Sequence, residues 1–277
     1  MSILLKQFHF EVDGVEYEAK YTKPGLTRAS VCFLHDIGDH FGRYEYVADY
    51  LCKEGVAIYG ADLPGHGKSP GIRGHVGPRQ GVYRIIDKLY VHARRASPAP
   101  IFVMGHSMGG NIALSYRLRN TDMDIKGYII SSPWLKLQKK ATLAQTFLLN
   151  AGAALFPSRA MDSGMTAEAR SRTRETAENA KKDPLMHLLI TPQTALDSSR
   201  AAGEILGKAN TWLAPVYLFH GTKDRVCSVE GSRIFSRACP GCKYREWEGF
   251  GHDTMMENGR DNVLGGVCRW IAAMTEQ

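Results

Sequence analysis

The most informative segment of this 277-residue sequence reads Ile101-Phe102-Val103-Met104-Gly105-His106-Ser107-Met108-Gly109-Gly110. The apolar run 101–104 predicts a buried strand, and the residues 111–118 that follow the segment predict a helix. Between them stands the pattern G-x-S-x-G, typical of a sharp turn that holds a strained serine at the carboxyl edge of a sheet. Glycines suit such a turn because a side chain there would clash with the neighbouring strand and helix. Ser107 is therefore a candidate nucleophile, and the Met108 N–H is a candidate donor to an oxyanion.

A serine nucleophile also needs an acid and a histidine, which follow it in that chain order. Asp224 lies in the loop after the apolar run 214–220, and His252 lies in the glycine-rich loop after the strand-like segment 244–247. Each residue has a plain alternative: a tight glycine turn for the serine motif, a turn acid or helix N-cap for Asp224, and an exposed loop histidine for His252. Their joint occurrence in strand-end loops, in the required order, favours a catalytic triad.

The second oxyanion donor is expected from a loop after an earlier strand. The loop 35–44 follows the apolar strand 30–34, so this position nominates the Ile37 N–H. Cys227 lies three residues after Asp224, and two interpretations stay open for it: a thiol that faces the site, or a buried inert thiol.

Strands and helices alternate along most of the chain, which predicts an α/β fold with right-handed crossovers and a mostly parallel sheet. Asp13-Gly14 joins two strand-like segments and predicts a hairpin at one sheet edge. Ligands of such sheets bind beyond the carboxyl ends of the strands, where every candidate residue lies. The predicted strands are 6–12, 15–21, 30–34, 56–61, 101–104, 126–131, 214–220 and 244–247, and the predicted helices of this part are 43–54, 78–95 and 111–118.

The alternation stops between about Trp134 and Asn210, where no convincing strand is predicted. We therefore divide the chain into a core over 1–133, an inserted helical cap over 134–210, and a second core part over 211–277. The segment 141–156 is almost wholly apolar yet too short to span a bilayer. It is either a lid that admits an acyl chain or a core element of the cap. The segment 167–182 predicts a solvated helix, and 185–190 and 195–206 predict further apolar helical faces.

Composition excludes several classes of protein. Hydrophobic residues make up 44% and charged residues 23%, as in ordinary globular domains. The net charge of +7 comes with no dense Lys/Arg cluster, so no nucleic-acid partner is expected. The segment 1–6 lacks the features of a signal peptide, which favours a cytoplasmic protein with six free cysteines. No cofactor and no metal is expected, and oligomeric state stays open.

Several of these segments together resemble the monoacylglycerol lipase and lysophospholipase branch of the α/β-hydrolases. They are 35–44, 62–74, GHSMGG at 105–110, 182–185, and 221–224 paired with 251–252. The resemblance implies the α/β-hydrolase fold, with Ser107 as nucleophile, Asp224 and His252 as its partners, and Ile37 and Met108 as oxyanion donors. It also implies that Asp39 and Arg43 border a polar pocket for the alcohol part of the substrate.

Two positions depart from the pattern of that branch. Glutamate is more frequent at the position of Asp39, and glycine is common at the position of Asp36. A carboxylate aimed at the oxyanion site would oppose catalysis, so the side chain of Asp36 is expected to point away from it.

The expected function is hydrolysis of carboxylic esters of lipid-like substrates, with monoacylglycerol or lysophospholipid favoured and peripheral membrane contact through the cap. One alternative is a carboxylesterase for short or aromatic esters. Another is a catalytically silent lipid-binding protein on the same fold.

Overall fold

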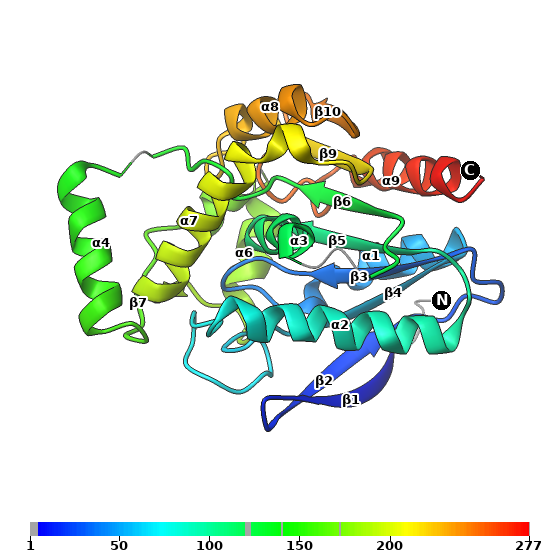
Figure 1. The fold of residues 1–277 in the computed structure, drawn as a ribbon, viewed down its shortest axis with the longest axis horizontal. Helices are drawn as coiled ribbons and strands as arrows, with labels where there is room; N and C mark the ends of the chain where they lie inside the picture. The colour runs from blue at the N-terminus through cyan, green and yellow to red at the C-terminus, as the bar shows by residue number, and fades with distance from the viewer. Residues whose placement is uncertain (1–4, 120–122, 140, 172, 277) are drawn as a thin grey trace.

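The structure, a computed structural model, describes residues 5–119, 123–139, 141–171 and 173–276. The residues 1–4, on which part of the signal-peptide expectation rests, and Arg172, inside the predicted helix 167–182, lie outside the described ranges. Figure 1 shows one large twisted sheet with helices on both faces. Its eight strands follow the order β1-β2-β4-β3-β5-β6-β9-β10. They are β1 (Lys6–Val12), β2 (Val15–Tyr21), β3 (Ala29–Leu34), β4 (Val56–Ala61), β5 (Ile101–His106), β6 (Gly127–Ser131), β9 (Val216–Gly221) and β10 (Cys242–Trp247).

The strand pairing confirms the predicted mostly parallel sheet. β4, β3, β5, β6, β9 and β10 run parallel, whereas the hairpin β1–β2 adds two antiparallel strands at one edge. Parallel strands need helical crossovers, which bury both faces of the sheet. β3 and β5 are accordingly buried at every residue.

The two faces of the sheet form two separate apolar cores, because successive side chains of a strand point to opposite faces. Val31 and Phe33 pack with α1 (Glu45–Lys53) and α9 (Arg260–Thr275). Cys32 and Leu34 belong to the other core. That core includes side chains of α2 (Arg79–Ala96), α3 (Met108–Arg119) and α8 (Val229–Ala238). A 3-10 turn η1 (Phe41–Tyr44) precedes α1. This layering places the carboxyl ends of the parallel strands together at one edge.

Between β6 and β9 the chain leaves the large sheet. This cap segment, residues 134–210, contains α4 (Leu143–Leu155), α5 (Ala167–Arg170), α6 (Arg174–Lys182), α7 (Pro192–Gly207) and most of the 3-10 turn η2 (Ala209–Thr211). α7 contacts α3, and its residues Ala201 and Ile205 join the core on that face of the sheet. α4 stands at the outer edge of the molecule, with α7 as its neighbour (Figure 1).

The structure corrects three predictions in the cap segment. The predicted helix 167–182 consists of two short helices, because Thr166 and Thr173 each cap a separate helix start. The residues 185–190, predicted as helical, end in the short strand β8 (Leu189–Ile190), which pairs with β7 (Met161–Asp162). The prediction of no strand in this part was therefore also wrong.

The apolar helix α4 is not a core element of the cap segment. Most of the side chains that made it look apolar are exposed, and Ala153 is its only buried residue among those described. Leu143 is 92% exposed and Phe147 72%. Of the helices in the described ranges, none is both long and apolar enough to cross a membrane.

Candidate active site

The serine turn has the geometry that its sequence pattern predicts. Ser107 takes a left-handed backbone conformation, with φ +53°. A Cβ on Gly109 would stand 2.2 Å from the carbonyl oxygen of Leu34, so helix α3 approaches the end of β3 as closely as only glycine permits. The Ser107 N–H donates to the Ser131 carbonyl at 2.9 Å, and its own carbonyl accepts from the Asn111 N–H at 3.0 Å. These bonds hold the strained turn at the carboxyl edge of the sheet.

Asp224 and His252 form a buried pair. Oδ2 of Asp224 lies 2.7 Å from Nδ1 of His252 and 2.9 Å from Nε2 of His220, and Oδ1 accepts the N–H groups of Val226 and Cys227. Burial alone would raise the pKa of Asp224, but His252 and His220 hold it below its ordinary value. Asp224 therefore stays ionised and can fix the orientation of the His252 ring.

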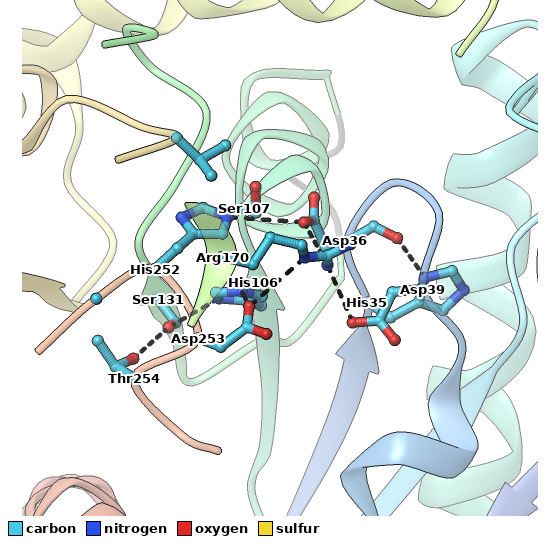
Figure 2. A network of polar contacts seen from close by, with 12 residues as sticks. His35, Asp36, Asp39, His106, Ser107, Ser131, Arg170, His252, Asp253 and Thr254 are labelled. Atoms are coloured by element: carbon cyan, nitrogen blue, oxygen red, sulfur yellow. Dashed lines mark hydrogen bonds and ion pairs between the residues drawn. The ribbon is translucent and has the colours of Figure 1, made fainter. Parts of the chain in front are cut away.

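Ser107 lies beside this pair without a hydrogen bond to it. Among the described residues, Nε2 of His252 has no hydrogen-bond partner. The hydroxyl of Ser107 lies 3.9 Å from the thiol of Cys227, which is fully buried. Figure 2 shows the Ser107 hydroxyl between the ring of His252 and the carboxylate of Asp36. The structure thus brings the three predicted residues together, but Ser107 and His252 do not form a hydrogen bond. Cys227 lies next to the candidate nucleophile.

The two predicted oxyanion donors converge, but on a carboxylate of the protein itself. The N–H groups of Ile37 and Met108 donate to the same atom, Oδ1 of Asp36, at 2.6 and 3.2 Å. The expectation that Asp36 points away from this position was therefore wrong. Its other oxygen, Oδ2, lies 3.6 Å from Nε2 of His252.

The physical reason for the orientation of Asp36 is a buried arginine of the cap segment. The guanidinium of Arg170 lies 2.7 Å from Oδ2 of Asp36 and 3.3 Å from Oδ2 of Asp39. It also donates to the Ile37 carbonyl at 3.2 Å, and its Nε is 3.8 Å from Asp253. Burial alone would raise the pKa of Asp36, but Arg170 and His252 hold it below its ordinary value. Asp36 is therefore ionised where it lies.

Asp39 and Arg43 belong to the same cluster of buried charges. Nη1 of Arg43 lies 2.9 Å from Oδ2 of Asp39, and the Tyr44 hydroxyl donates to that oxygen at 3.1 Å. Asp39 is fully buried. Arg43 also borders a separate surface hollow of about 500 Å³. The structure thus places Asp39 inside the protein instead of on the border of an open pocket.

The candidate site is closed to solvent. Ser107 is 2% exposed and His252 is fully buried. A nearby hollow of about 870 Å³ lies between the cap segment and the loops after β9 and β10. Asp224 and Gly251 line it, whereas Ser107 and His252 do not. Ser107 is thus covered by protein atoms in this arrangement, and the hollow does not reach it.

One group of metal-ligating atoms occurs among the described residues. One ligand atom each of Asp36, His106 and His252 lies within 4.8 Å of the others. The carboxylate in this group is already paired with Arg170 and with two N–H donors. We therefore assign no metal to it.

Sequence reasoning missed three residues of this network. His106 contacts Asp253 at 3.3 Å and the hydroxyl of Ser131 at 3.0 Å, and Arg170 joins the acids (Figure 2). The positions of His106 and Asp253 beside Ser107 and His252 were a usable signal. No sequence signal marked Arg170, because it stands in a polar segment with the pattern of a solvated helix.

A strained serine at a strand-to-helix turn, with acid and histidine supplied by later strand-end loops of a mostly parallel sheet, is the arrangement of the α/β-hydrolases. The profile of the family described as serine aminopeptidase, S33, matches residues 25–259, and the chain belongs to this family.

Individual relatives agree with this assignment. The chain is 28% identical to the monoacylglycerol lipase of Mycolicibacterium smegmatis, over 89% of each sequence. It superposes on the crystal structure of Paleococcus ferrophilus monoacylglycerol lipase with a TM-score of 0.83 and 25% identity, covering 98% of this chain and all of that one. It is also 26% identical to an uncharacterized abhydrolase domain-containing protein of Dictyostelium discoideum, over 90% of this chain but only 27% of that protein. The comparisons confirm the predicted resemblance, the fold, and the predicted enzyme class, a carboxylic ester hydrolase.

Proposed function

We propose that the chain hydrolyses carboxylic esters of lipid-like substrates, monoacylglycerol or lysophospholipid, through an acyl-enzyme on Ser107. The observation that carries the proposal is the buried Asp224–His252 pair beside a serine held at φ +53°. Similarity to two monoacylglycerol lipases supports the substrate class.

The proposed chemistry divides among the residues of the site. Ser107 Oγ attacks the ester carbonyl carbon while His252 Nε2 takes its proton, and Asp224 stabilises the imidazolium. The N–H groups of Ile37 and Met108 then bind the oxyanion. The bond to the alcohol breaks, and the alcohol leaves with the proton from His252. Water, deprotonated by the same imidazole, then releases the fatty acid and restores Ser107.

The cap segment, residues 134–210, has two proposed tasks. It covers Ser107 between turnovers, and it carries α4, whose exposed apolar side chains suit contact with a lipid surface. These side chains are Leu143, Phe147, Leu148 and Leu155, and Phe156 directly after the helix is also exposed. We propose a peripheral membrane contact at this helix, on a protein of the cytoplasm. Asp39 and Arg43 keep their proposed role toward the alcohol part of the substrate, after the cap segment has moved.

The proposal is tested by the loss of activity in Ser107→Ala. We expect kcat on p-nitrophenyl butyrate to fall by about 10⁶-fold, the scale of losses of a triad serine. A fluorophosphonate probe should label the wild type and leave the variant unlabelled. Retained turnover in the variant would reject Ser107 as the nucleophile.

A substrate panel then separates the ester classes. Monoacylglycerols of increasing acyl length are compared with lysophosphatidylcholine and with acetyl and feruloyl esters. Higher kcat/KM on long-chain monoacylglycerol supports the proposal, and a preference for acetyl or feruloyl esters supports the carboxylesterase alternative.

One observation favours the catalytically silent alternative: Asp36 fills the position that an ester oxyanion would need. A silent protein would neither turn over esters nor react with the fluorophosphonate, in the wild type or in variants of Asp36.

A further inference from the structure

We propose that Asp36 is a self-inhibiting residue of the hydrolase reaction. Held by Arg170 of the cap segment, its carboxylate occupies the oxyanion position, and catalysis begins only after this carboxylate has been withdrawn. The inference rests on the proposed function, because it assigns a role to the same site.

The geometry makes Asp36 and a reacting ester mutually exclusive. Oδ1 of Asp36 accepts from the Ile37 N–H at 2.6 Å and the Met108 N–H at 3.2 Å, while Oδ2 faces Nε2 of His252 at 3.6 Å. A carboxylate product would place one oxygen between the same two donors and the other near the histidine. The carboxylate of Asp36 thus occupies the position that the carboxylate of the product would take. Hydrogen-bond donors that are occupied cannot stabilise a developing oxyanion.

Asp36 also acts on the proton acceptor. His252 is fully buried, faces Asp224 on one side and Asp36 on the other, and its ring lies 4.8 Å from that of His106. Burial lowers the pKa of His252, but the two carboxylates outweigh burial and raise the pKa to about 10. An imidazolium cannot take the proton of Ser107. Asp36 thus adds to the larger effect of Asp224 in favouring the imidazolium, besides occupying the oxyanion position.

Arg170 couples this block to the position of the cap segment. Its guanidinium contacts Asp36, Asp39 and Asp253, which belong to loops after β3 and β10. When the cap segment moves away, Asp36 loses its closest cation, the Arg170 guanidinium, and keeps the more distant His252. Loss of this ion-pair partner leaves a buried carboxylate poorly compensated, so Asp36 then favours a position open to water. Movement of the cap segment would thus open the path to Ser107 and empty the oxyanion position together.

The experiment compares Asp36→Gly with the wild type. The variant empties the space between the two N–H donors and leaves Arg170 paired with Asp39 and Asp253. We expect kcat/KM on p-nitrophenyl butyrate and the rate of fluorophosphonate labelling to rise roughly 100-fold, the scale of one oxyanion donor. The acidic limb of the pH–rate profile should move to lower pH by about 1–3 units, because His252 loses the carboxylate that favours its charged form.

A further variant separates the two effects proposed for Asp36, its occupation of the oxyanion position and its stabilisation of the charged form of His252. Asp36→Asn keeps an oxygen for the two N–H donors but removes the charge, so we expect the shift of the acidic limb with a much smaller gain in rate. It also keeps the test open if Asp36→Gly does not fold. The matched control is Asp124→Asn, which removes a carboxylate that is 89% exposed and pairs with Arg94 on the surface, and should give no gain in labelling rate.

The outcomes distinguish this inference from the proposed function. A wild type that labels at Ser107, together with an Asp36→Gly variant of equal or lower rate and unchanged thermal unfolding, overturns the inference alone. An unshifted acidic limb in Asp36→Asn, or a gain in Asp124→Asn equal to that of Asp36→Gly, also overturns it. Absence of labelling in the wild type and in both Asp36 variants would overturn the proposed function and the inference with it.

Discussion

Ser107 and Gly109 show how single residues build the site. A serine at φ +53° is strained, since side chains other than those of Asn and Asp rarely adopt this conformation. The strain is maintained because the turn is fixed from both sides, by β6 through the Ser131 carbonyl and by the close approach of Gly109 to β3. Strain of this kind is typical of functional sites and costs about 1–3 kcal/mol.

Gly109→Ala should therefore damage both the fold and the site. The new methyl group would meet the backbone carbonyls of Leu34 and His35 at 2.2 and 2.6 Å, so β3 and α3 must separate. Forced overpacking of this kind typically costs about 1–3 kcal/mol. We expect a lower urea midpoint, and lower kcat because the chain that leads to the Ile37 N–H is displaced.

The matched control is Gly203→Ala in helix α7. This glycine is exposed, and a Cβ on it would meet nothing within 4 Å. Alanine in a helix interior is more stable than glycine by about 0.5–1 kcal/mol, so the midpoint should rise. Equal midpoints for the two variants would contradict the packing that we describe at Gly109.

At the scale of residues, the sequence predicted which residues lie at the strand ends around Ser107, but not how their side chains are oriented. Ser107, Asp224 and His252 could be placed because each stands at a strand end and the strands are parallel. The direction of the Asp36 side chain could not be predicted. It depends on Arg170, which is distant in the sequence and carries no motif.

At the scale of elements, α4 is the feature that sets the cap segment apart. A helix that buries one face normally shows an apolar stripe that faces the core, but most of the large apolar side chains of α4 are exposed: Leu143, Phe147, Leu148 and Leu155. Exposed apolar patches of this kind mark contacts with other molecules or with membranes. Figure 1 shows α4 at the outer edge of the molecule, where a lipid surface can reach it.

We expect the double variant Phe147→Ser, Leu148→Ser to lose binding to phosphatidylcholine vesicles in a flotation assay. Each side chain buried in lipid contributes about 1.5–3 kcal/mol, so the loss should be large. Thermal unfolding should change little, because both side chains are already exposed in the protein.

Leu213→Ser serves as the control for this experiment. Leu213 is 83% exposed and lies outside α4, so its loss should leave vesicle binding unchanged. Equal binding by the double variant and the wild type would contradict the membrane contact that we propose.

The elements of the core were predictable, whereas those of the cap segment were only partly so. Long buried strands and the Asp13-Gly14 hairpin have strong local patterns, and the structure places strands there, with β1, β2 and β4 at the predicted limits. The prediction of one helix over 167–182 was wrong because the segment is polar throughout and shows no break in composition, whereas two threonine caps divide it into two helices. β8 is two residues long, too short for any periodicity to indicate it.

At the scale of the whole molecule, Arg170 joins the cap segment to the core. Its side chain is 2% exposed and faces three buried carboxylates. Removing one partner of a buried ion pair leaves charge without compensation and typically costs about 3–5 kcal/mol. We expect Arg170→Met to lower the free energy of unfolding at pH 7 by about this amount, measured by urea denaturation.

Arg174→Met, also in the cap segment, is the control. Arg174 is 92% exposed and pairs with Glu178 on the surface, so its loss should cost about 1 kcal/mol or less. Equal losses in the two variants would contradict a stabilising role of the buried cluster.

The pH dependence of Arg170→Met has a definite sign. In the wild type the pKa of Asp36 is held below its ordinary value, so its contribution to stability is present above about pH 4 and is lost as the pH falls. Without Arg170 the buried acids favour their protonated forms, so their contribution to the free energy of unfolding of the variant rises as the pH falls. The difference in stability between wild type and variant should therefore narrow between pH 7 and pH 4.

The ion cluster around Arg170 also has a consequence for biosynthesis. Its members leave the ribosome far apart in time: Asp36 and Asp39 first, Arg170 much later, and Asp253 last. An incomplete chain that has not yet produced Arg170 can pair Asp39 with Arg43 but lacks the cation closest to Asp36, so it gains little by closing that loop. We expect translation products that stop before Arg170 to remain open and susceptible to proteolysis, and the native arrangement of the cluster to form only after Asp253 has emerged.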